Sequence, residues 1–265
     1  MNKRLNYWLA LSVSLVMATS PIIFSSCSDG APKKDQKEAN KDGNGENGES
    51  NGSNPGEGQS VTGKVGKYPY VDLGLPSGLK WATYNIGATK IEESGNYFAW
   101  GETTPQPKSD YCWTTYKWRS GNPRSVTKYC TDRFYGTVDD LTTLLPEDDA
   151  ATANWGSAWR MPTMEEQEEL REACDWKWTN NFNGTRKSGM IGTSKTNGNT
   201  IFLPAAGCYD CGRHNNTVGY YGSYWSSSLS EFSNSASVLD FDSDHIGEFS
   251  YPRPDGQPVR AVSEE

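Results

Sequence analysis

The 265-residue sequence contains only two histidines and a single apolar stretch, which lies near the N-terminus. A protein that crosses a membrane several times needs repeated apolar runs of about 20 residues, so this class is excluded. The formal net charge is −8, and an acidic chain repels nucleic-acid phosphates, so no nucleic-acid partner is expected. With two isolated histidines, neither a histidine-based zinc site nor a histidine-activated nucleophile is expected.

Aromatic residues are abundant although the mean hydropathy is only −0.76. The chain has 10 Trp, 14 Tyr and 8 Phe, which a fully disordered chain would lack. Residues 28–60 contain no aromatic residue, and their only apolar side chains are Ala31 and Ala39. Such a segment cannot offset its ordering entropy. We therefore predict a signal peptide over 1–26, a lipidated cysteine and disordered tether over 27–62, and one domain over 63–265.

The N-terminus has the pattern of an export signal. Two basic residues at positions 3 and 4 precede an apolar stretch over 5–17, which is typical of a secretory signal peptide rather than of a signal anchor. Phe24-Ser25-Ser26-Cys27 resembles a bacterial lipobox, in which the cysteine receives lipid. The alternative is that Cys27 is an ordinary residue of the leader. With two or more acyl chains on Cys27, anchoring in outer-membrane lipid would be stable.

Ser28-Asp29, directly after Cys27, resembles the acidic signal that sends lipoproteins of Bacteroidota to the outer face of the outer membrane. An exported outer-membrane lipoprotein displayed at the cell surface is therefore expected.

Short strands dominate the local patterns after the tether. The tripeptide Pro76-Ser77-Gly78 between β-prone runs at 70–75 and 79–83 predicts a hairpin. Thr163 and Glu166 form a capping box that predicts a helix starting at Thr163, and a shorter helix is expected over 148–154. Further strands are expected over 96–100, 201–204, 224–228, 236–242 and 259–262.

Several phrases in one order carry a resemblance to a known family. These phrases occupy residues 71–82, 97–102, 155–156, 159–163, 202–207, 224–228 and 259–262. Together they resemble the Fibrobacter succinogenes major paralogous domain, which is common in lipoproteins of Bacteroidota, over roughly residues 66–262. That family is similar to the C-type lectin-like fold in its formylglycine-generating-enzyme branch. The resemblance implies an α+β fold with small twisted antiparallel sheets, two helices and long loops.

The cysteines after Cys27 number five, and two of them form a C-x-x-C motif, Cys208 to Cys211. An exported protein can oxidise such a pair, so a local disulfide or unpaired loop thiols are the favoured interpretations. Zinc would need a second pair of ligands, and a redox site would need a thioredoxin-like setting. No metal and no cofactor are therefore expected.

An acidic run places Asp240, Asp242 and Asp244 at alternate positions. On a strand the three carboxylates would share the solvent face, where they either bind Ca²⁺ or remain solvated. The spacing after Asp244 does not fit an EF-hand, so a solvated acidic face is favoured.

The C-terminal loops have the composition of adaptable binding surfaces, because tyrosine supplies rigid amphipathic area and asparagine, serine and glycine supply hydrogen bonds. The alternative is that they are ordinary solvated loops. The candidate ligand-binding residues are Tyr209, Asp210, Arg213, Asn215, Tyr220, Tyr221, Tyr224, Asn234, Asp244, His245, Tyr251 and Arg253.

The expected function is a surface-anchored, non-catalytic ligand-binding or adhesion domain for an unidentified glycan or protein. No catalytic residues are assigned, because no recognised catalytic motif occurs. Three alternatives remain open at this point. They are a variable protein of a diversity-generating retroelement, an enzyme of the formylglycine-generating type that uses Cys208 and Cys211, and a structural component of a surface assembly.

Overall fold

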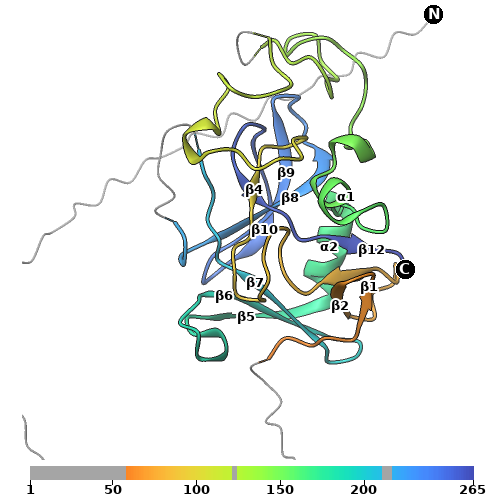
Figure 1. Cartoon of the computed structure of the whole chain (residues 1–265), viewed down its shortest axis with the longest axis vertical. Helices are drawn as coiled ribbons and strands as arrows, with labels where there is room; N and C mark the ends of the chain where they lie inside the picture. Colours follow the sequence, from red (N-terminus) through yellow and green to blue (C-terminus); the bar gives the residue numbers. More distant parts are fainter. Residues whose placement is uncertain (1–57, 121–123, 211–216) are drawn as a thin grey trace, which may run out of the picture. The chain divides into compact units, whose positions relative to one another are not determined.

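Short strands and two α-helices are joined by long loops in the part of the chain that the structure describes (Figure 1). The computed structural model describes residues 58–120, 124–210 and 217–265, all of which lie in one compact unit, Gly52–Glu265. The strands are β1 (Gly63–Val65), β2 (Tyr68–Asp72), β3 (Lys80–Ala82), β4 (Tyr97–Phe98), β5 (Cys174–Thr179), β6 (Gly189–Ser194), β7 (Thr200–Pro204), β8 (Gly222–Leu229), β9 (Ser235–Phe241), β10 (Ile246–Pro252), β11 (Gln257–Pro258) and β12 (Val262–Ser263). The α-helices are α1 (Ala150–Trp155) and α2 (Met164–Ala173), and short 3-10 turns cover Lys108–Asp110, Pro146–Asp148 and Phe182–Gly184.

The strands of the described residues form small sheets with antiparallel pairing. Their orders are β1-β2-β3-β12, β5-β6-β7, β10-β9-β8 and β11-β4. A strand-rich molecule with two α-helices and several small antiparallel sheets belongs to the α+β class, as the sequence predicted.

The predicted hairpin around Pro76-Ser77-Gly78 is confirmed. β2 pairs with β3 and places Val71 opposite Trp81, while Val262 of β12 pairs with Trp81 from the other side. The strand expected over 259–262 is largely wrong, because residues 259–261 are in no strand and β12 consists of Val262 and Ser263, which pair with β3. The first and the last strands of the unit therefore share one sheet.

Both predicted helices are present and both have side-chain caps. The Thr163 hydroxyl accepts a hydrogen bond from the backbone N–H of Glu166, and the Glu166 carboxylate accepts one from the N–H of Thr163. α1 begins after Asp149, whose carboxylate accepts hydrogen bonds from the N–H groups of Ala151 and Thr152. These caps satisfy backbone donors that have no partner inside a helix.

Four tryptophans are completely buried and form much of the core. Trp100, Trp159 and Trp225 belong to one apolar cluster, and Trp81 belongs to a second cluster with Leu170 and Phe241. None of the helices in the described residues combines the length and the apolar character needed to cross a bilayer.

The segment before β1 contacts the rest of the fold earlier than the predicted tether boundary at residue 62. The backbone N–H of Ser60 donates a 3.0 Å hydrogen bond to the carbonyl of Thr200. The Gln59 side chain accepts a hydrogen bond from the N–H of Phe202 and donates one to the carbonyl of Thr83. The last residues assigned to the tether are thus attached to β7.

Candidate functional site

Tyr224, a predicted ligand contact, belongs to the core instead. It is only 1% exposed and lies on β8, where every residue from Gly222 to Ser227 is buried. Its hydroxyl donates a 2.8 Å hydrogen bond to the carbonyl of Pro204 and accepts one from the amide of Asn85. The prediction was wrong because the side chain is enclosed and its polar atom is already satisfied.

Arg253 was also wrongly predicted as a ligand contact. Its side chain is 0% exposed, and its guanidinium donates hydrogen bonds to the carbonyls of Lys128, Tyr129 and Ser233. The same group lies over the ring of Trp100, 4.9 Å from its centre. Arg253 therefore joins loops from inside the protein and offers no donor to solvent.

Tyr209 and Asn234 have structural contacts as well. Tyr209 is buried. Its ring packs edge-on against the ring of Tyr97, with 4.6 Å between the ring centres, and stacks on the ring of Tyr111. Its aromatic face is therefore not available to a ligand. Asn234 is half-buried, and its backbone carbonyl accepts a hydrogen bond from the N–H of Arg253. Arg213 and Asn215 lie outside the described residues, as do Cys27 and Cys211.

The predicted acidic face divides into two environments. β9 ends at Phe241, and the Asp242 carboxylate accepts hydrogen bonds from the N–H groups of Asp244 and His245 in an exposed turn. Asp240 is half-buried and accepts a 3.1 Å hydrogen bond from the hydroxyl of Tyr251. The expectation that three carboxylates share one solvent face was therefore wrong. Among the described residues, no group of three carboxylate, thiol or imidazole side chains could hold a metal ion.

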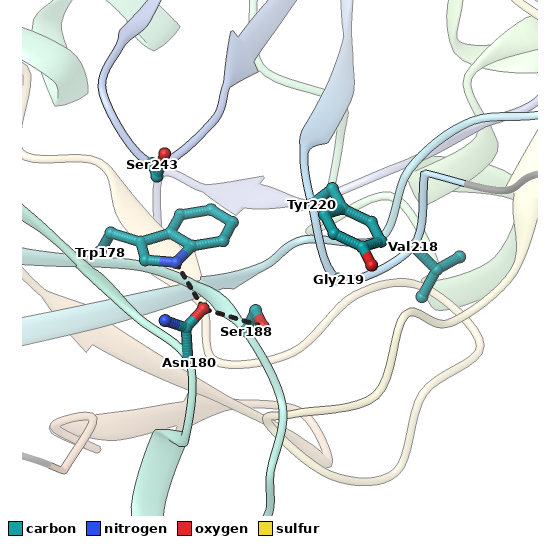
Figure 2. Close-up of a pocket in the computed structure, with 7 residues that line it drawn as sticks. All are labelled: Trp178, Asn180, Ser188, Val218, Gly219, Tyr220 and Ser243. Atoms are coloured by element: carbon teal, nitrogen blue, oxygen red, sulfur yellow. Dashed lines mark hydrogen bonds between the residues drawn. The ribbon is translucent and has the colours of Figure 1, made fainter. Parts of the chain in front are cut away.

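Tyr220 remains a surface residue and borders an open cavity of about 520 Å³. The lining residues are Trp178, Asn180, Ser188, Val218, Gly219, Tyr220 and Ser243. Figure 2 shows the Trp178 indole and the Tyr220 ring on opposite sides, with Asn180 and Ser188 below them and Ser243 above the indole. We name this space the Trp178–Tyr220 cavity. Tyr220 is 75% exposed, which is unusual for so large a side chain in a folded protein.

Residues in or next to the β5–β6, β7–β8 and β9–β10 connections line the Trp178–Tyr220 cavity. Trp178 and Asn180 come from the end of β5, and Ser188 comes from the residue before β6. Tyr220 belongs to a turn whose Gly219 N–H donates a 2.7 Å hydrogen bond to the carbonyl of Ala205, just after β7. Gly219 has a φ of +87°, a conformation that glycine adopts without a steric penalty. The exposed aromatic ring is thus carried on a turn tied to a strand.

The polar groups of this cavity are neutral. Asn180 Oδ1 accepts a hydrogen bond from the Trp178 indole N–H at 2.8 Å and contacts the Ser188 hydroxyl at 3.5 Å. No group in the described residues uses the Nδ2 amide of Asn180, so its two N–H donors remain for a ligand. Two aromatic faces with an amide and hydroxyls suit a polyhydroxylated, uncharged ligand.

Asp210 and Tyr251 line a second cavity, of about 410 Å³, and no described residue lines both cavities. Its lining residues are Trp113, Cys208, Asp210, Tyr251, Pro252, Pro254 and Asp255. Asp255 was not predicted from the sequence, because Pro254-Asp255-Gly256 has the pattern of an exposed turn. Tyr221, a predicted contact, lies beside this cavity, and its hydroxyl contacts the Cys208 sulfur at 2.8 Å.

The thiol of Cys208 is free, as are those of Cys130 and Cys174, whereas Cys112 is disulfide-bonded. The local Cys208–Cys211 disulfide considered from the C-x-x-C spacing is therefore absent. Burial raises the pKa of the Cys208 thiol to about 11. At neutral pH this sulfur is protonated and a poor nucleophile.

Comparison of the chain with protein-family models, with curated proteins and with solved structures gives no match. The functional argument therefore depends on the sequence patterns and on the geometry of the two cavities.

Proposed function

We propose that this chain is a non-catalytic binding protein for a glycan or a protein ligand, and that the Trp178–Tyr220 cavity is the place of contact. The observation that carries this proposal is the 75% exposed ring of Tyr220 opposite the Trp178 indole, with the free amide donors of Asn180 between them. Of the two ligand classes, the cavity favours a glycan. The apolar face of a sugar ring can stack on an aromatic side chain, and its hydroxyls can pair with the amide and serine groups.

The fold and the location belong to the same proposal. The two helices, the small antiparallel sheets and the long loops support a C-type lectin-like fold, which holds binding loops on a rigid frame. Attachment to outer-membrane lipid through acylated Cys27, and display at the cell surface, are supported by the lipobox-like pattern of the sequence. A long polar tether between the lipid anchor and the domain would let the domain bind ligands farther from the membrane.

A binding role is favoured over an enzyme of the formylglycine-generating type by the state of Cys208. A nucleophilic thiol is usually ionised by a nearby cation or a helix N-terminus. The Tyr221 hydroxyl donates a hydrogen bond to the Cys208 sulfur, which by itself lowers the pKa of the thiol. Burial and three nearby carboxylates outweigh this contact and favour the protonated thiol; they are Asp255, Asp210 and Asp240.

The proposal is tested with the full chain, solubilised in a mild detergent, on an array of glycans and host-type surface proteins. We expect specific glycan signals that weaken about tenfold or more in Tyr220→Ala, because the variant removes the exposed aromatic platform. Asn180→Ala should weaken the same signals, because it removes the two amide donors. Both residues are exposed, so their replacement should leave the fold intact.

Phe134→Ala is the matched control. Phe134 is an exposed aromatic residue like Tyr220, with 52% of its surface exposed, but it lines neither cavity. Its replacement should leave the array signals unchanged. The assignment of the site is overturned if the signals persist in Tyr220→Ala and Asn180→Ala, or if Phe134→Ala abolishes them equally.

A further inference from the structure

The second cavity contains a buried carboxylate that has no partner. Asp255 is only 7% exposed and lines the cavity of about 410 Å³. Within the described residues, no hydrogen-bond donor and no cation pairs with its carboxylate. Burial disfavours an ionised carboxylate that has neither a hydrogen-bond donor nor a counter-ion, so such a group at a cavity wall points to a ligand that supplies the missing partner.

A second carboxylate lies next to Asp255. The backbones of Tyr209 and Gly256 form an antiparallel bridge, with hydrogen bonds of 2.9 and 2.8 Å. This pairing brings Asp210, the residue after Tyr209, opposite Asp255, the residue before Gly256. Like charges at opposed positions repel each other. The Tyr111 ring packs directly against Gly256, where a Cβ atom would come within 2.8 Å of it. This contact holds the backbone next to Asp255 in place.

Aromatic and proline side chains complete the walls. Trp113 and Tyr251 line the cavity together with Pro252 and Pro254. Among the described residues that line it there is no lysine, arginine or histidine, and the Nζ atom of the nearby Lys108 lies 5.2 Å from the ring centre of Tyr209. Carboxylates beside aromatic faces are the usual surroundings of a bound ammonium or guanidinium group, because both attract a cation.

We propose that this second cavity is a binding site for a protonated amine or a guanidinium group, which pairs with Asp255 and lies against Trp113 and Tyr251. Two sources offer this chemistry, namely a lysine or arginine side chain of a partner and the free amine of an amino sugar. The site is distinct from the Trp178–Tyr220 cavity, since no described residue lines both.

The site should depend on pH. The titratable groups around Asp255 in the described residues are Asp210, Cys208, Tyr251 and, behind Tyr251, Asp240. Burial, together with the nearby Asp210 carboxylate, raises the pKa of Asp255 to about 7. An amine binds the ionised carboxylate, so its affinity should rise as the pH increases through 7.

The test is an NMR titration of the ¹⁵N-labelled full chain at low ionic strength. The probe is the blocked tripeptide acetyl-Gly-Lys-Gly-amide, and its control carries norleucine, which has the same stem without the amine. A second pair, glucosamine and N-acetylglucosamine, tests the amino-sugar source. The reporter is the indole N–H signal of Trp113, assigned with Trp113→Phe.

The amine-bearing member of at least one pair should shift the Trp113 signal, with binding at least about tenfold weaker in Asp255→Asn than in the wild type. Affinity should also be lower at about pH 5 than at about pH 8. Asp244→Asn is the matched control, because it removes one exposed negative charge outside the cavity and should leave binding unchanged. Tyr220→Ala should leave it unchanged as well.

The proposal is overturned if neither amine shifts the Trp113 signal at about 20 mM, a concentration that would detect even weak binding. It is also overturned if the norleucine and N-acetyl controls bind equally well, or if Asp255→Asn binds like the wild type. A loss of glycan binding in Tyr220→Ala with intact amine binding separates the two sites.

Discussion

The Nε atom of Arg253 donates a 2.9 Å hydrogen bond to the hydroxyl of Tyr116, and both side chains are buried. The Tyr116 hydroxyl in turn donates to the carbonyl of Trp100. The other guanidinium N–H groups donate to three backbone carbonyls, those of the adjacent Lys128 and Tyr129 in one loop and that of Ser233 in another. One side chain thus replaces the secondary structure that these long loops lack, because it satisfies carbonyls that would otherwise be buried without partners.

Arg253→Lys should therefore lower the free energy of unfolding by about 3 kcal/mol, because lysine cannot present donors in the planar arrangement of guanidinium. Urea denaturation of both proteins measures this difference. Arg133→Lys, at an exposed position, is the control and should change stability by less than about 0.5 kcal/mol. A loss in Arg253→Lys no larger than that of the control would contradict the role given to Arg253.

Tyr224→Phe separates structural from ligand-binding tyrosines. The variant removes the hydrogen bonds of the Tyr224 hydroxyl with Pro204 and Asn85 inside the core, so it should cost about 1 to 2 kcal/mol of stability. Tyr220→Phe removes an exposed hydroxyl and should cost almost nothing. Thermal unfolding of the two variants gives the comparison, and equal melting temperatures would show that Tyr224 is not enclosed as described.

The stability of Asp255→Asn should depend on pH relative to the wild type. The Asp255 carboxyl has a pKa of about 7 in the folded protein and about 4 in the unfolded chain, so the folded state holds its proton more strongly. As the pH rises from about 4 to 7, ionisation destabilises the wild type but not the variant. Asp255→Asn should thus gain relative stability across this window and no more above it. Melting temperatures at several pH values test this, and a pH-independent difference would refute it.

The thiol of Cys208 should react slowly in the folded protein. Burial raises its pKa to about 11, so the thiolate fraction at pH 7.5 is very small. Alkylation by iodoacetamide, followed by mass spectrometry of the Cys208 peptide, should be at least about tenfold slower than in the urea-unfolded chain. Fast native alkylation of Cys208 would instead favour the enzyme alternative.

Local signals in the sequence predicted the elements whose causes are local. The capping box at Thr163 and Glu166 and the turn between β2 and β3 depend on residues a few positions apart, and both are present. β5 and β6 were not predicted. β6 contains Gly189 and Gly192, which are typical of loops. In the structure these glycines accept the rings of Phe202 and Trp176, which a Cβ atom would meet within 2.7 and 2.8 Å. The requirement for glycine at these two positions comes from side chains on neighbouring strands, so it cannot be recognised from the local sequence.

The binding residues were harder to predict for the same physical reason. Tyrosine, serine and glycine make up adaptable loops, but they also make up the buried start of β8, so composition did not distinguish Tyr220 from Tyr224. Arg253 lies between two prolines, a turn pattern, yet its guanidinium points inward. Trp178 was missed because β5 was missed, and Asp255 because its neighbour Asp210 is distant in sequence.

The pairing of β12 with β3 has a consequence for how the protein is made. Val262 and Ser263 are far from β1 and β2 in the sequence, yet they complete the sheet that those two strands begin. During synthesis the first strands are therefore made long before the strand that pairs with β3. Contacts between such distant segments form slowly, so this sheet should be completed late in folding. Deletion of Val262 and Ser263 would leave the edge of β3 open to other strands.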